Sequence, residues 1–333
     1  VSTGDGYAMP DVRPSLLLDF ANSKTLDPRI TFTRGSTATY WDGQTTAKAE
    51  ENLVNYSQQL NTQTFAIGGA FTADQTTAPD GTTTADLFTE DTSVTAHVWG
   101  KSASQGILNR QAGQYTVSVY AKANGRTAHT IKSVIGPTSY VACIFDLSGG
   151  TAGTPVVSGG NYSAASSSIQ SVGSGWYRCS LTFTVNATLT DCSIGLSNTT
   201  TPTWQNYGDV NYVGDGSSGV YFWGLQQENR STATAYTATT SSPTVKYQPV
   251  LQTAASGVAR FDHNPATGES KGLLIEEART NLATYSVDFS NAAWLKSGIS
   301  VETDNIVAPD GALYNDNIIR ENSSNVDTLS TKR

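Results

Sequence analysis

Apolar and polar residues alternate one by one in several segments of the chain. Every second position is apolar in 115–119 and again in 177–183. Successive side chains of a β-strand point to opposite faces of a sheet, so this period places one set in a core and the other at the surface. Further strands are expected at 141–145, 192–196 and 220–225.

Clusters of Gly, Asn and Ser separate these strands and mark tight turns, at 124–125, 148–150, 158–160, 173–175 and 214–216. Several short strands with regular turn signals indicate an all-β fold, an antiparallel β-sandwich of jelly-roll type. No long segment carries apolar residues at the helical period of 3.6 residues. The best short helix lies around Gly272–Thr280, and its pattern is ambiguous.

The first 50 residues are rich in loops and contain two strand-like runs, Leu16–Phe20 and Ile30–Arg34. So short a segment cannot bury a core by itself. We interpret residues 1–50 as an irregular N-terminal attachment segment, residues 51–240 as the β-sandwich module and residues 241–279 as a linker.

A repeat places the start of a second, similar module after the linker. The block Glu51–Ser57 resembles Thr280–Ser286 at an offset of 229 residues, and Ala78–Gly81 recurs as Ala308–Gly311 at an offset of 230. Both copies have an aromatic residue between the two blocks, at Phe65 and Trp294. Residues 280–333 cannot close a sandwich by themselves, so we expect the native polypeptide to continue past them.

Composition narrows the functional classes. Charged residues make up 14% of the chain, whereas 46 Thr and 36 Ser supply much of its polarity. The net charge of −8 disfavours a general nucleic-acid binder, because an acidic surface does not release counterions from phosphate. No apolar run approaches the ~20 residues that span a bilayer, and no signal peptide is visible at the start, so we expect no membrane insertion.

Few residues suit catalysis or metal binding. The three cysteines form no CxxC motif, so we expect buried free thiols, with a Cys179–Cys192 pair on neighbouring strands as the alternative. The three histidines have no zinc-binding spacing, and no GxSxG elbow or phosphate loop occurs. The GxGxxG letters of Gly214–Gly219 lead into a strand instead of a helix. We therefore predict no enzyme, no catalytic residues, no metal site and no cofactor.

Two alternatives stay open at the acidic side chains. Glycoside hydrolysis needs two carboxylates at catalytic separation, and the candidates are Asp146, Asp191, Asp209, Asp215 and Glu228. A structural Ca²⁺ would take oxygen ligands from the loops that carry Asp80, Asp146, Asp215 and Asp304. Turn formation and solvation are the simpler interpretation of these residues.

Aromatic rings beside amide or guanidinium groups are the best candidates for ligand binding, because sugars need flat rings together with hydrogen-bonding side chains. The predicted ligand-binding residues are Trp204, Asn206, Tyr207 and Tyr212 in one stretch, and Trp176 with Arg178 after a Gly-Ser-Gly turn. A covering role for Trp176 at the open end of the sandwich is the alternative.

Several strings of the chain resemble those of fibre and spike proteins of tailed bacteriophages. They run from about residue 30 onward, at Ile30–Tyr40, Tyr115–Lys122, Gly175–Cys179, Val220–Gln226 and Gly272–Leu282. The resemblance implies a virion structural protein whose jelly-roll modules are similar to carbohydrate-binding modules. It also implies a homotrimer, attachment to other virion proteins through residues 1–50, and a host-surface glycan as ligand.

On this basis we expect a tail fibre of the virion, assembled in the host cytoplasm, that presents its modules for host attachment. A head fibre, spike or decoration protein with a purely structural role is one alternative. A polysaccharide depolymerase is the other.

Overall fold

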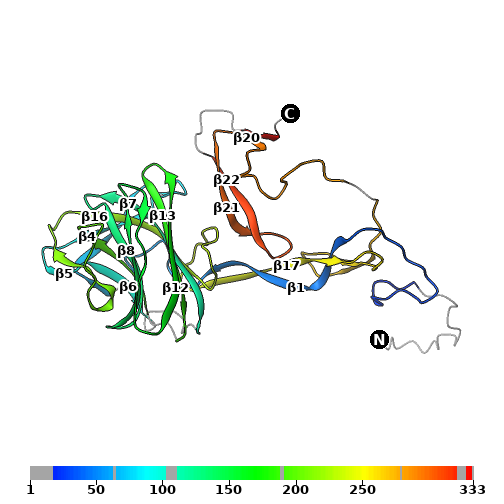
Figure 1. Ribbon diagram of the computed structural model, residues 1–333, viewed down its shortest axis with the longest axis horizontal. Coiled ribbons are helices and arrows are strands. Elements are labelled where there is room, and N and C mark those ends of the chain that lie inside the picture. Colours follow the sequence, from blue (N-terminus) through cyan, green and yellow to red (C-terminus); the bar gives the residue numbers. More distant parts are fainter. Residues whose placement is uncertain are drawn as a thin grey trace, which may run out of the picture. The chain divides into compact units, whose positions relative to one another are not determined.

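The computed structural model describes residues 18–62, 65–102, 111–187, 191–277, 280–320 and 328–331 (Figure 1). In these ranges the chain forms several antiparallel β-sheets, which confirms the predicted all-β fold. The one helical element that they contain is a short 3₁₀ turn, η2 (Asn206–Gly208).

Two large sheets form the sandwich. The first has the strand order β10-β9-β8-β14-β6-β2, with β11 also paired to β9, and the second has the order β12-β13-β7-β16-β4-β3. The strands of the first sheet are β2 (Phe65–Ile67), β6 (Val98–Ser102), β8 (Ala128–Gly136), β9 (Ser139–Asp146), β10 (Thr151–Ala152), β11 (Val156–Ser158) and β14 (Asp191–Ser197). Those of the second are β3 (Gly69–Thr76), β4 (Ala85–Glu90), β7 (Gly113–Asn124), β12 (Tyr162–Gly173), β13 (Trp176–Val185) and β16 (Gly219–Glu228).

The other described strands form two-stranded sheets. These are β1 (Ala38–Asn52) with β17 (Thr244–Ala254), β5 (Val94–Ala96) with β15 (Asn211–Val213), β18 (Phe261–His263) with β19 (Ser270–Leu273), β20 (Trp294–Ser297) with β23 (Thr328–Thr331), and β21 (Ile299–Val307) with β22 (Leu313–Arg320).

The core of the sandwich contains the residues that the alternation places inward. Val117 and Val119 of β7 and Cys179 and Leu181 of β13 are fully buried in one cluster with Ile194 of β14, which comes from the other sheet. Burial of a Val or Leu side chain stabilises a fold by about 1.5–3 kcal/mol. The period of two read from the sequence therefore corresponds to the packing that holds the two sheets together.

The strand predicted at Ile30–Arg34 is wrong. The segment pairs with no strand of the described chain. The Arg34 side chain holds it instead, because Nη2 donates to the carbonyls of Ala255 (2.6 Å) and Val258 (2.9 Å). In the other predicted strand, Leu16 and Leu17 lie outside the described residues, and Leu18–Phe20 is not a strand.

The ambiguous helix around Gly272–Thr280 is absent from the described part of that segment. β19 begins the segment and pairs with β18. Gly272 has φ 84°, which lies in the left-handed region and ends any helical path there. Residues 278 and 279 lie outside the described residues.

All three cysteines are free and buried, as expected. Cys179 lies on β13 and Cys192 on β14, and these strands belong to different sheets. The alternative of a Cys179–Cys192 pair on neighbouring strands is therefore wrong.

The chain forms two compact units. One contains Lys48–Lys246, Ala283–Val307 and Leu313–Arg333, and the other contains Val1–Ala47, Tyr247–Leu282 and Ala308–Ala312. The sandwich thus interrupts the second of these units in sequence. The predicted domain boundaries stay predictions.

Polar contacts between residues far apart in sequence hold the interrupted unit together. The N–H of Trp41 donates to Asp262 Oδ1 (2.9 Å), and Arg260 Nη1 donates to the carbonyl of Thr39 (2.8 Å). The ring of His263 bonds the carbonyl of Trp41 through Nδ1 (3.0 Å). These bonds therefore join β1, which precedes the sandwich in sequence, to the segment around β18, which follows it.

Candidate functional site

The structure places the six predicted ligand-binding residues in three separate regions. They are the loop with Trp204, Asn206 and Tyr207, the strand β15 with Tyr212, and the strand β13 with Trp176 and Arg178. Because β13 belongs to the second large sheet and the loop packs on the first, these residues do not form one site.

The loop around η2 presents an aromatic ring to solvent. Trp204 is half-buried against a small apolar cluster with Tyr140 of β9, and it anchors the loop. Tyr207 is 46% exposed and has φ 64°, a left-handed conformation that is costly for a residue other than glycine. Its N–H donates to the carbonyl of Pro137 (2.8 Å), which holds it there. Asn206, next to it, is exposed.

A buried ion pair fixes the end of this loop. The ammonium of Lys132, which is almost fully buried on β8, donates to the carboxylate of Asp209. The N–H of Gln205 also donates to the carbonyl of Asp209 (2.9 Å). The loop is therefore a closed turn tied to the sheet, and the Tyr207 ring projects from a fixed support.

Tyr212 belongs to a buried network and not to an open surface. Its hydroxyl donates to Glu90 Oε2 (2.6 Å), and Glu90 also accepts from Arg126 Nε (2.7 Å) and the N–H of Asp215 (2.7 Å). Burial tends to raise the pKa of Glu90, but the bonds from Arg126, Tyr212 and Asp215 outweigh it and lower that pKa. Burial, together with the Glu90 carboxylate, raises the pKa of Tyr212.

Trp176 and Arg178 lie on the side of β13 that faces away from the core. Trp176 is buried, and its Nε1 donates to the carbonyl of Thr77 (3.0 Å). Arg178 is 7% exposed and lies over the ring of Tyr120, with its Cζ 5.4 Å from the ring centroid. Its Nη2 donates to the carbonyl of Thr234 (2.5 Å), so a segment after β16 covers this face. Both side chains therefore contribute to packing.

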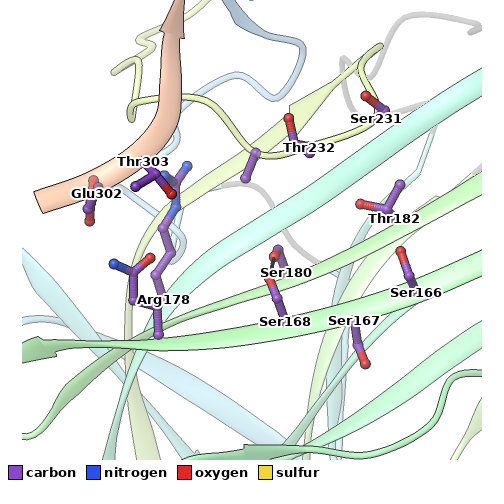
Figure 2. Close-up of a pocket in the computed structure, with 12 residues that line it drawn as sticks. Ser166, Ser167, Ser168, Arg178, Ser180, Thr182, Ser231, Thr232, Glu302 and Thr303 are labelled. Carbon is purple, nitrogen blue, oxygen red and sulfur yellow. Dashed lines mark hydrogen bonds between the residues drawn. The ribbon is translucent and has the colours of Figure 1, made fainter. Parts of the chain in front are cut away.

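A pocket of about 260 Å³ lies beside Arg178, over β12 and β13 (Figure 2). Hydroxyl groups make up much of its lining: Ser166, Ser168, Ser180, Thr182, Ser231 and Thr232. Ser168 and Ser180 bond each other (2.6 Å), and Gln170, Glu302 and Thr303 also line the pocket. Such a lining can donate and accept hydrogen bonds, but no aromatic ring is among these residues.

Sequence reasoning missed this pocket, although its signal was present. The alternation in β13 places Ser180 and Thr182 opposite the core residues Cys179 and Leu181. The neighbouring β12 pairs Ser168 with Ser180 in register. The pairing of the two strands, which brings their hydroxyls together, was not visible from either segment alone.

The candidate carboxylates are held by different contacts, and Asp146 and Asp215 act within their own turns. Asp146 accepts from Ser148 Oγ (2.6 Å) and Asp215 from Ser218 Oγ (2.6 Å), and these bonds lower the pKa of both carboxyls. Glu228 is buried, which raises its pKa, and it accepts from the N–H of Thr234 (3.0 Å). Asp209 is paired to Lys132 as described above. The side chain of Asp191 lies outside the described residues.

Within the described ranges, His, Cys, Asp and Glu side chains form no group of three or more that could hold a metal ion. The loops considered for Ca²⁺ contain short turns closed by an aspartate. Asp80 Oδ1, for example, accepts from both the N–H (2.9 Å) and the hydroxyl (2.7 Å) of Thr82. The structural Ca²⁺ stays an untested alternative.

No family model matches this chain, and no curated protein shows significant similarity to it. Among the described residues, no helix has the length and apolar character that crossing a membrane requires.

Proposed function

We propose that this chain is a structural protein of a tailed-bacteriophage virion, a tail fibre that presents a glycan-binding β-sandwich to the host surface. The all-β fold, the strings that resemble phage fibre proteins and the hydroxyl-rich composition support this role. In this proposal residues 1–50 attach to other virion proteins, and a homotrimer multiplies weak single-site binding through avidity.

We infer that the sandwich is a jelly roll, and the strand order supports this. The core of one sheet reads β4-β16-β7-β13, and that of the other reads β6-β14-β8-β9. Along the chain the path passes between the sheets at β2–β3, β4–β6, β6–β7, β7–β8, β11–β12, β13–β14 and β14–β16. Such crossing is typical of two interleaved Greek keys.

The observation that carries the glycan proposal is the exposed ring of Tyr207. Solvent reaches almost half of this side chain, and the loop holds it in a strained left-handed conformation beside the exposed amide of Asn206. Strain of this kind persists where the surrounding structure enforces it, and it often occurs at binding sites. A sugar ring stacked on Tyr207 would have the Asn206 amide within reach for hydrogen bonds to its hydroxyls.

The test is binding of the full chain to an array of bacterial envelope polysaccharides, with Tyr207→Ala as the variant. An aromatic contact contributes about 0.5–1.5 kcal/mol, and 1.4 kcal/mol is tenfold in affinity, so we expect binding that is weaker by roughly 2- to 10-fold. Tyr247→Ala is the matched control, because Tyr247 is an exposed tyrosine of β17, outside the sandwich. Equal binding by the Tyr207 variant, or no glycan bound by the parent chain, would contradict the proposal.

The position in the particle is tested separately. Immunogold labelling of purified virions should place the chain on the tail, whereas label on the capsid would support the head-fibre or decoration alternative. Release of reducing sugar from a bound polysaccharide would support the depolymerase alternative.

A further inference from the structure

Residues 280–320 and 328–331 repeat the backbone conformation of the start of the sandwich. Four positions in the left-handed region recur at the offset of the sequence repeat. They are Tyr56 and Tyr285 (φ 49° and 53°), Gly68 and Gly298 (68° and 70°), Asp74 and Asp304 (57° and 55°), and Gly81 and Gly311 (86° and 83°). Left-handed conformations are uncommon outside glycine, so recurrence at two tyrosines and two aspartates is strong evidence that the two segments share one fold.

The same carboxylate closes both copies. Asp86 accepts from the N–H of Leu60 (2.8 Å) through Oδ2 and from that of Asp74 (3.1 Å) through Oδ1. In the second copy Asp316 accepts from Phe289 (2.5 Å) through Oδ2 and from Asp304 (3.4 Å) through Oδ1. Each aspartate therefore ties the loop before the hairpin to the bulge within it.

Strand pairing also repeats residue by residue. Gly69 pairs with Glu90 in β3–β4, and Ile299 pairs with Arg320 in β21–β22. The register shifts between Thr72 and Thr76 in the first hairpin and between Glu302 and Ile306 in the second. The pair β20–β23 corresponds in the same way to β2–β6.

The two copies differ in what covers them. In the first copy β4 pairs on its other side with β16, and Phe88 is completely buried. In the second, β22 pairs with β21 alone among the described strands, and Ile318, at the position of Phe88, is 45% exposed.

We propose that the free edge of β22 and the apolar side of its hairpin are a docking surface for a strand of the β16 type. The first copy shows the fit, because Val220 of β16 lies opposite Phe88 and Phe222 lies opposite Asp86. The docked strand therefore places one apolar side chain opposite Ile318 and the next apolar one opposite Asp316. This inference is independent of glycan binding, since it concerns how a second sandwich assembles on residues 280–331.

The test extends the chain with a second copy of residues 104–240, because Arg333 corresponds to Ala103 at the offset of 230. Hydrogen exchange with mass spectrometry then follows the amides of β22. We expect exchange at least tenfold slower than in the unextended chain. The control carries the same extension with Val220→Asp and Phe222→Asp in the added copy, and there β22 should exchange as in the unextended chain.

A second extended chain with Val301→Phe and Ile318→Phe restores the larger side chains of the first copy, Phe71 and Phe88, and guards against a failure caused only by poor core filling. The proposal would be overturned if β22 exchanged as in the unextended chain both in the plain extended chain and in the extended chain with Val301→Phe and Ile318→Phe. Protection of β22 in the unextended chain that rises with protein concentration would also overturn it, because a second copy of the chain would then occupy the edge.

Discussion

Replacing Tyr212 by Phe removes one hydrogen bond from the Glu90 network and keeps the ring. The ring of Tyr212 packs against His97 with centroids 4.3 Å apart, and the guanidinium of Arg126 lies over it at 5.3 Å. Since the phenylalanine ring fills the same volume, no cavity forms. The lost bond joins a buried hydroxyl to a carboxylate that is 2% exposed, and bonds to charged groups contribute about 1.5–3 kcal/mol.

We therefore expect Tyr212→Phe to lower the free energy of unfolding by about 2 kcal/mol at pH 7. Urea unfolding followed by tryptophan fluorescence measures it, because four of the six tryptophans (Trp99, Trp176, Trp204 and Trp223) lie in the sandwich. Tyr221→Phe is the matched control, since Tyr221 is half-buried and its hydroxyl bonds no residue in the described part of the chain.

The effect should depend on pH in a defined direction. The pKa of Glu90 is lower in the folded chain than its ordinary value of 4.5, so its contribution to stability is present above that value and is lost as pH falls through the folded pKa. The difference between Tyr212→Phe and the parent should therefore shrink in acid. An equal cost of Tyr212→Phe in a Glu90→Gln background would contradict this prediction, because the bond to the carboxylate would then not be the cause of the lost stability.

Two further predictions concern buried groups. Asp86→Asn should destabilise the chain by about 2–3 kcal/mol, because one buried N–H loses its acceptor, whereas Asp316→Asn at the half-buried equivalent site should cost less than about 1 kcal/mol; equal losses in urea unfolding would contradict this. Burial raises the pKa of Cys143 to about 11, so iodoacetamide at pH 8 should leave all three buried thiols unlabelled in the native chain and label them in urea; native labelling would refute it.

Local pattern was sufficient for five strands of the sandwich, β7, β9, β13, β14 and β16. In β7 and β13 the inward residues are apolar and most of the outward residues are polar, so the period of two identifies both the strand and its buried face. Ile30–Arg34 has the same kind of pattern but no strand beside it, and a pattern alone does not supply a partner. For the same reason the pocket was not predicted, because its lining forms only when β12 and β13 pair side by side.

The candidate site could be predicted only in part, because covering segments come from far along the chain. Trp176 and Arg178 have the residue types of a sugar site, yet residues far from them in sequence, Thr77 and Thr234, bond them and close the surface. Tyr212 is buried, and its hydroxyl bonds Glu90, which lies 122 residues away in sequence. Tyr207 stays exposed because its own turn holds it outward, which is a local property.

The chain enters and leaves the sandwich at neighbouring positions. Glu50 and Lys246, close to the points where the chain enters and leaves, form an ion pair at 2.7 Å, and β1 pairs with β17. A domain with adjacent ends can be inserted into a host chain or removed from it with little change to the flanking path. Recombination in the two strands of this ribbon could therefore exchange the whole sandwich as a cassette, and the interrupted unit would keep its own contacts from Trp41 to Asp262.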